Sequence, residues 1–458
     1  MYASLDQSRN NPSPAPLMHT DHDFPASPIS SLAGEILLEI GRVEVLEILD
    51  VLSCSLVCRR WNEVFGTLTK QFPNFSHLKL VGDYEEFTED WIEEDWNAAH
   101  EYARRLMGLL AESKRMGLNH RNKVQSIQLN LRDMFDWLST SVHLPEMEDF
   151  FVSVFSIGFP NLKSIHLEYT LIPSGELPLD RIRLFLARIL PFCNTVDELM
   201  VIDRDEDLED ASDLQNPRHF IKEFVQGLSR NLTVLILSCH KLDSGLEEAL
   251  KNCRNLSDIT FEEMNSDDVT RCIQHWPNLR SLGMRLSEQP SDELLLKIGA
   301  NLPNLCELHI HGSKLHPGPK VLVELLGRCN RLRELILTDM DSVDDTVLGV
   351  IAGTCRNLKN LWLSNSERLT GLNLPSVSIH WQKMERLYLD GCSNVEASFV
   401  GNVVANSLNI SELKLPRHLE QNGELRQMLV RSSFRCTKKQ FGSEYWEKVV
   451  GGENGQGI

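Results

Sequence analysis

Apolar residues recur in a short fixed pattern along most of this chain. The pattern reads L-x-x-L-x-L with polar residues between the leucines, and a clear copy is NLKNLWL, which begins at residue 357. Alternate residues of a β-strand point to opposite faces, so the last two apolar positions of each copy predict a short strand with one buried face. Copies begin at residues 123, 161, 195, 231, 255, 278, 304, 331, 357, 383 and 409, with a further candidate at 74.

The spacing of the copies indicates a repeat. From residue 231 onward the copies follow one another at intervals of 23 to 27 residues. The segments between them carry apolar residues at helical spacing, and Asp or Ser stands near several of their starts, as helix N-termini prefer. The clearest predicted helices are 244–253, 291–302, 319–329 and 344–355.

One strand and one helix per unit of this length is typical of leucine-rich repeats. The predicted fold class is therefore an α/β solenoid. This is a horseshoe with parallel strands on the concave face and helices on the convex face, in which each repeat buries its apolar residues against its neighbours.

Cysteines occupy repeated positions in this pattern. Cys392 follows a predicted strand, and four other cysteines stand just before a copy of the pattern. These arrangements resemble the cysteine-containing class of leucine-rich repeats. Trp276 and Leu302 take the same position elsewhere, so we interpret the cysteines as apolar packing residues rather than reactive thiols or metal ligands. The four cysteines are Cys193, Cys253, Cys329 and Cys355.

Charge narrows the possible partners. The chain has 65 acidic and 46 basic residues, a net charge of −19, which disfavours nucleic acid as a partner. No apolar run of about 18 residues predicts a membrane span, so we expect no membrane partner and a cytoplasmic and/or nuclear location. Two acidic stretches, 83–96 and 201–213, are predicted as insertions, either solvated loops or a docking lobe for a basic partner.

A different pattern precedes the repeats. Apolar residues between 28 and 65 predict three short amphipathic helices. This segment contains Leu-Ala-Gly-Glu-Ile-Leu at 32–37 and Ser-Leu-Val-Cys-Arg-Arg-Trp at 55–61, and it resembles an F-box. It departs from that family at Ala33, where Pro is usual, and at Gly41, where Phe is usual.

The resemblance implies an organisation and a function. We expect a disordered tail (1–27), an F-box-like helical domain (28–68), a leucine-rich-repeat domain (69–433) and a C-terminal tail (434–458). F-box proteins with such repeats are substrate receptors of Skp–cullin–F-box ubiquitin ligases. The F-box binds a Skp-family adaptor and, through it, cullin, while the repeats hold a target protein for ubiquitination and degradation.

The resemblance also implies which residues bind the adaptor, and it implies no catalysis by this chain. The sequence contains no P-loop, Rossmann glycine pattern, G-x-S-x-G or zinc-protease helix. We therefore expect no enzyme activity, no cofactor and no metal site. The expected adaptor-binding residues are Leu32, Ile36, Leu37, Leu56, Val57, Cys58 and Trp61.

The target is expected on the concave face. Trp362 and Tyr388 take the middle position of neighbouring strands, and partly exposed aromatic side chains are frequent binding anchors. Alternatively, aromatic residues of the C-terminal tail cover them. His309 and His311 share a strand face but have no evident third ligand for a metal. The predicted target-binding residues are Glu307, His309, His311, Glu334, Trp362, Arg386, Tyr388 and Asp390.

A second function remains open at this point. Ala33 and Gly41 lie in the half of the F-box that members use to hold their adaptor. The alternative is a repeat scaffold or inhibitor that binds a protein without coupling it to a ligase.

Overall fold

The structure is a computed structural model of the chain. The described residues are 77–79, 108–115, 117, 120–131, 144–169, 179–203, 219–239, 242–288, 290–312, 318–372, 381–440 and 443–449. The chain divides into two units, Met1–Pro73 and Asn74–Ile458, and all described residues belong to the second. The predicted tail 1–27, the F-box-like domain 28–68 and the acidic stretch 83–96 lie outside the described residues.

One sheet runs through the described part of the second unit. Its 14 strands follow the order β1 to β12, then β14 and β13. Strands β1 to β12 pair in chain order and in parallel, as the repeat predicts. These strands are β1 (His77–Lys79), β2 (Ser126–Asn130), β3 (Ser164–Tyr169), β4 (Glu198–Asp203), β5 (Val234–Ser238), β6 (Asp258–Glu262), β7 (Ser281–Arg285), β8 (Glu307–His311), β9 (Glu334–Thr338), β10 (Asn360–Ser364), β11 (Arg386–Tyr388) and β12 (Glu412–Lys414).

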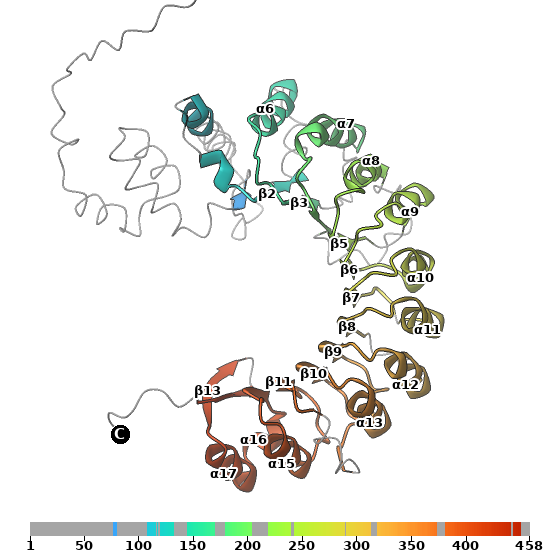
Figure 1. Cartoon of the computed structure of the whole chain (residues 1–458), viewed down its shortest axis with the longest axis vertical. Coiled ribbons are helices and arrows are strands. Elements are labelled where there is room, and N and C mark those ends of the chain that lie inside the picture. The colour runs from blue at the N-terminus through green and yellow to red at the C-terminus, as the bar shows by residue number, and fades with distance from the viewer. Residues whose placement is uncertain are drawn as a thin grey trace, which may run out of the picture. The chain divides into compact units, whose positions relative to one another are not determined.

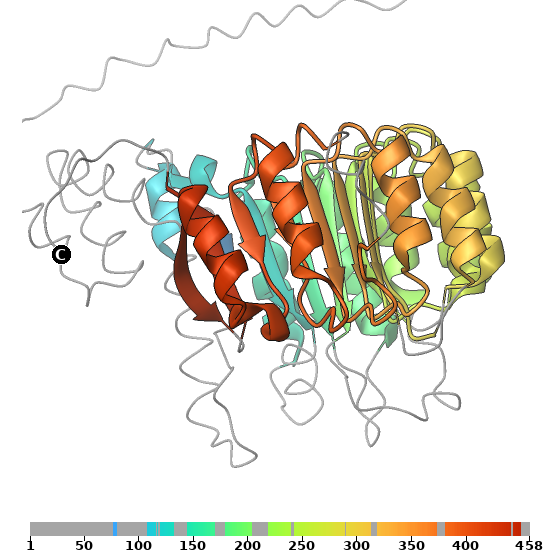
Figure 2. The ribbon, with the colours of Figure 1, turned by 90° about the horizontal axis from the view of Figure 1, so that it is seen from below.

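Helices form the second layer of this unit. They lie along the outer side of the strands (Figure 1), and the turned view shows those of the C-terminal repeats in front of the strands (Figure 2). The four clearest predicted helices are confirmed within two residues at each end, as α9, α11, α12 and α13. The helices are α6 (Leu144–Ser156), α7 (Leu179–Ile189), α8 (His219–Leu228), α9 (Ser244–Lys251), α10 (Ser266–Cys272), α11 (Asp292–Asn301), α12 (Pro319–Arg328), α13 (Asp345–Thr354), α15 (Ala397–Asn406), α16 (Arg417–Glu420) and α17 (Gly423–Arg431), with short 3-10 turns η3 (His120–Lys123), η4 (Leu190–Phe192) and η6 (Ile273–His275).

Leucines of the repeat pattern fill the space between the two layers. Leu335, Leu361 and Leu387 occupy one register position on β9, β10 and β11, and each is at most 1% exposed. Burying a leucine side chain stabilises a fold by about 1.5–3 kcal/mol. The equivalent leucines of neighbouring strands lie next to one another, so every repeat completes the core of its neighbours.

The repeated cysteines belong to this core. Cys193, Cys253, Cys329 and Cys355 are each at most 4% exposed. Burial raises the pKa of all four thiols to about 12. A thiol with so high a pKa stays protonated and unreactive near neutral pH, which agrees with a packing role.

The acidic stretch 201–213 and the C-terminal segment 434–458 both differ from their prediction. The first three residues of the predicted insertion 201–213 complete β4, and the rest lie outside the described residues. Residues assigned to a C-terminal tail form β13 (Phe434–Gln440) and β14 (Ser443–Lys448), an antiparallel pair that joins β12 through β14. Trp446 on β14 is 2% exposed, so this pair covers the last repeat as solenoid ends require.

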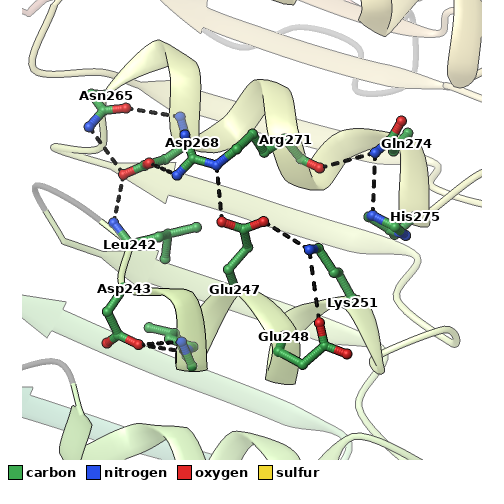
Figure 3. A network of polar contacts seen from close by, with 12 residues as sticks. Leu242, Asp243, Glu247, Glu248, Lys251, Asn265, Asp268, Arg271, Gln274 and His275 are labelled. Carbon is green, nitrogen blue, oxygen red and sulfur yellow. Dashed lines mark hydrogen bonds and ion pairs between the residues drawn. The ribbon is translucent and has the colours of Figure 1, made fainter.

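Polar contacts also join neighbouring helices on the outer layer. Asp268 at the start of α10 is 2% exposed and accepts hydrogen bonds from the Leu242 backbone nitrogen at 2.6 Å and from Arg271 (Figure 3). Arg271 also donates to Glu247 of α9 at 3.0 Å, and Glu247 pairs with Lys251 at 2.8 Å. Every charged group of this network has a partner within it, so we interpret it as structural.

Truncating a leucine of the strand row tests the packing. Leu361→Ala removes a side chain that is 1% exposed, and it should lower the free energy of unfolding by about 2–5 kcal/mol in a urea titration. Leu408→Ala is the control, because Leu408 is 84% exposed and its loss should change stability by less than about 0.5 kcal/mol. Equal effects of the two variants would contradict the described packing.

Candidate functional site

The middle residues of the strands form one continuous row on the concave face. The predicted alignment of these residues is confirmed by the strand register from β2 to β12. Since the leucines on either side point into the core, each middle residue and those two positions before and after it face away from the helices. The row reads Gln128, His166, Met200, Ile236, Thr260, Gly283, His309, Ile336, Trp362, Tyr388 and Lys414.

Aromatic side chains cluster at the C-terminal end of this row. Trp362 and Tyr388 are half-buried, and their rings meet edge to face with centroids 5.4 Å apart. Tyr445 of β14 pairs in register with Lys414 and brings its ring centroid within 6.0 Å of that of Tyr388. The Lys414 ammonium lies 6.0 Å from the centroid of the Trp362 ring. We call Trp362, Tyr388, Lys414 and Tyr445 the aromatic cluster.

Glu412 holds the two tyrosines of the aromatic cluster in place. Its Oε2 atom accepts hydrogen bonds from the Tyr388 hydroxyl at 2.7 Å and the Tyr445 hydroxyl at 2.6 Å, and it lies 3.0 Å from Arg386 Nε. Burial raises the pKa of the Glu412 carboxyl, but the two hydroxyls and the Arg386 charge outweigh it, so the pKa lies below its ordinary value. Burial and the Glu412 hydrogen bond raise the pKa of Tyr388, so the phenol stays protonated.

A polar cluster lies beside the aromatic cluster, on strands β8 to β10. Glu334 on β9 places its two oxygens 2.9 Å from His309 Nε2 and 2.6 Å from Asn360 Nδ2. The close approach of the His309 ring is the main reason that the pKa of the Glu334 carboxyl lies below its ordinary value, with Asn360 and the Arg386 charge adding to it. The carboxylate thus links β8, β9 and β10.

The remaining predicted residues lie beside these two clusters. His311 Nδ1 is 2.8 Å from the Thr338 hydroxyl, and partial burial together with the nearby His309 lowers the pKa of its imidazole. Asp390 pairs with Lys414 at 2.8 Å. Glu307 is half-buried and aligned with Glu334 on the next strand.

All eight residues predicted to bind the target therefore share the concave face of strands β8 to β11 and the turn after β11. Glu412 was missed, whereas Tyr445 was considered only as one of the C-terminal aromatic residues that could cover Trp362 and Tyr388, and its ring does contact Tyr388. Glu412 has the same position in its repeat as Arg386, and this alignment could have found it. Tyr445 follows the last copy of the repeat pattern, so no sequence periodicity places it. The predicted adaptor-binding residues, Leu32 to Trp61, lie outside the described residues.

This arrangement has the features of a binding surface. A rigid aromatic surface edged by paired charges is typical of protein-binding sites. Within the described ranges, no group of three or more His, Cys, Asp or Glu side chains is placed to hold a metal ion. No helix among the same residues has the length and apolar character to cross a membrane.

Two comparisons with known proteins can be set beside this geometry. No family model matches the chain. Among solved structures, the chain is similar to a chain in the crystal structure of the Rad7 and Elc1 complex in yeast. The sequence identity is 14% and the TM-score is 0.41, over 70% of this chain and 79% of that chain.

The Glu412 contacts predict a pH-dependent contribution to stability. A carboxyl whose pKa is lowered by folding adds stability above its unfolded-state pKa, and this addition disappears as the pH falls through the folded-state pKa. At pH 7 Glu412→Gln should therefore unfold at lower urea than the wild type. The difference should shrink as the pH falls below about 4.

Glu367→Gln is the matched control, because Glu367 is exposed and has no side-chain partner among the described residues. Its effect should be small at every pH. A stability difference for Glu412→Gln that does not change with pH would contradict the described role of the carboxylate.

Proposed function

We propose that this chain is the substrate-recognition subunit of a Skp–cullin–F-box ubiquitin ligase. In this proposal residues 28–68 bind a Skp-family adaptor, and the adaptor connects the chain to cullin. The concave face of the repeats binds the target protein. The chain performs no catalysis itself but holds the target near the conjugating enzyme, which raises the rate by proximity. It acts in the cytoplasm, the nucleus or both.

The aromatic cluster is the observation that carries the target-binding half of the proposal. Trp362 and Tyr388 are half-buried without being covered by the repeat core. Glu412 and Tyr445 fix the orientation of Tyr388, and Trp362 donates a hydrogen bond to the Ser364 hydroxyl. Fixed side chains lose little conformational entropy when a partner binds, and large aromatic residues supply most of the binding energy in many interfaces. The contact of Tyr445 with Tyr388 extends this surface onto β14.

The ligase half of the proposal rests on the sequence of residues 28–68. Residues 55–61 match the end of the F-box pattern, and this segment is followed by repeats, a known combination in F-box proteins. The alternative is a repeat scaffold or inhibitor without ligase coupling. The substitutions at Ala33 and Gly41 favour it, since both lie in the adaptor-binding half of the motif.

A measurement of adaptor binding distinguishes the ligase subunit from the scaffold or inhibitor. The full chain should co-purify with a Skp-family adaptor, and removal of 28–68 should abolish this while leaving the urea midpoint of the repeats unchanged. The deletion lies within the first unit, Met1–Pro73, so it does not cut the repeats. Val57→Asp should also abolish binding, whereas Ser53→Asp adds the same charge outside the expected contact set. A full chain that binds no such adaptor would support the scaffold alternative.

The aromatic cluster can be tested independently of the adaptor. Affinity purification with the variant Trp362→Ala/Tyr388→Ala should retain the adaptor and lose one protein that the wild type captures. Hot-spot aromatic residues typically contribute at least about 2 kcal/mol each, so the target should fall below detection. Phe192→Ala, which removes a 37% exposed aromatic side chain from another part of the solenoid, should retain the target. An unchanged set of proteins in the double variant would rule out this cluster as the target site.

A further inference from the structure

A basic groove lies at the edge of the solenoid, where the chain enters each strand. It encloses about 1030 Å³ and crosses successive repeats from Arg254 to Lys383. Its lining includes six cationic residues and one acidic residue, Asp258, in a chain whose net charge is −19. The cationic residues are Arg254, Arg280, Arg331, Arg333, Lys359 and Lys383.

The repeat geometry makes this groove continuous. Backbone hydrogen bonds of 2.7 Å run from Arg280 to Ser257, from Cys306 to Arg280, from Arg333 to Cys306 and from Lys359 to Arg333. These residues therefore form one row with a spacing of about 4.8 Å, the distance between neighbouring strands. A second row stands two residues earlier in each repeat and faces the same side. It consists of Asn255, Asn278, Asn304, Arg331, Asn357 and Lys383.

Most of the positive charge in the groove is not neutralised. Arg254, Arg280 and Arg333 are exposed, and their guanidinium groups form no ion pair or side-chain hydrogen bond with the described residues. Arg331 and Lys383 donate to neutral side-chain oxygens, those of Asn304 at 2.7 Å and Asn357 at 2.6 Å. Lys359 pairs with Glu385 at 2.5 Å.

We propose that this groove binds an extended, Asp- and Glu-rich segment of a partner polypeptide. The cations are spread singly along a line of repeats, so they match a row of carboxylates along an extended chain. The inference goes beyond the proposed function, because the groove includes neither the aromatic cluster nor residues 28–68. A partner can therefore use it whether or not the chain is coupled to a ligase.

Nucleic acid fits this groove less well. Proteins that bind single strands stack the bases on aromatic side chains, and no aromatic residue is among those that line the groove. The surrounding acidic chain also repels a long phosphate backbone, whereas a short acidic segment meets mainly the local positive charge.

The test measures binding of a labelled acidic peptide to the purified full chain. The probe is a fluorescein-labelled peptide of alternating Glu and Ser, about ten residues long, enough to span the groove at about 3.3 Å per residue. The variant Arg280→Ser/Arg333→Ser should bind it about fivefold to tenfold more weakly, since exposed charge pairs contribute modestly. Added salt should weaken wild-type binding and reduce this difference.

Lys320→Ser/Arg328→Ser is the matched control, because it removes the same charge from α12 on the outer layer. It should bind the peptide as the wild type does. Equal losses in both double variants, or no binding by the wild type, would overturn the proposal. A labelled oligothymidylate of about ten nucleotides is the second probe. The proposal would also be overturned if the wild type bound this probe as tightly as the peptide, or more tightly, and the groove variant did not bind it. If the peptide binds only after the acidic residues of 83–96 are replaced by Ser, the groove is occupied by this segment of the chain itself, and the proposal of a partner segment is wrong.

Discussion

Stacking of leucines between parallel strands and outer helices is the constraint on which the rest of this structure depends. Leu335, Leu361 and Leu387 can be excluded from water only if neighbouring repeats hold the same register. The same register fixes the residues between the leucines on the opposite face, about 4.8 Å apart. The concave row and the basic groove are therefore both consequences of how the core packs.

Charge is distributed differently over these two surfaces. On the concave face several acidic groups are matched by neighbours, as Glu334 is by His309 and Glu412 is by Arg386. Such pairs fix side-chain positions and leave little free charge, which favours recognition by shape and aromatic contact. In the groove the guanidinium groups have few partners, so charge itself is available for binding. A partner with both an apolar anchor and an acidic segment could use both surfaces.

Much of the solenoid could be predicted from the sequence, because its repeat has a regular length. Counting from one leucine pattern to the next placed Trp362 beside Tyr388 and assigned the cysteines to the core. A contact of C-terminal aromatic residues with this pair could be considered, but the position of Tyr445 could not be predicted, since β13 and β14 follow the last repeat and pair antiparallel. The groove was also missed, because its cations come from different repeats and form a line only once the strands are aligned. Side-chain pairing, such as Glu412 with two tyrosines, depends on rotamers that periodicity does not determine.

The proposed function requires that the chain binds an adaptor and a target at the same time through separate surfaces. A two-step purification tests it most directly. A photo-crosslinking amino acid at position 362 captures the bound protein, and the complex is then isolated through a tagged Skp-family adaptor. We expect the cross-linked protein to be recovered with the adaptor, and the same amino acid at position 328 on α12 to capture no protein. Recovery of the cross-linked protein only in complexes that lack the adaptor would contradict it.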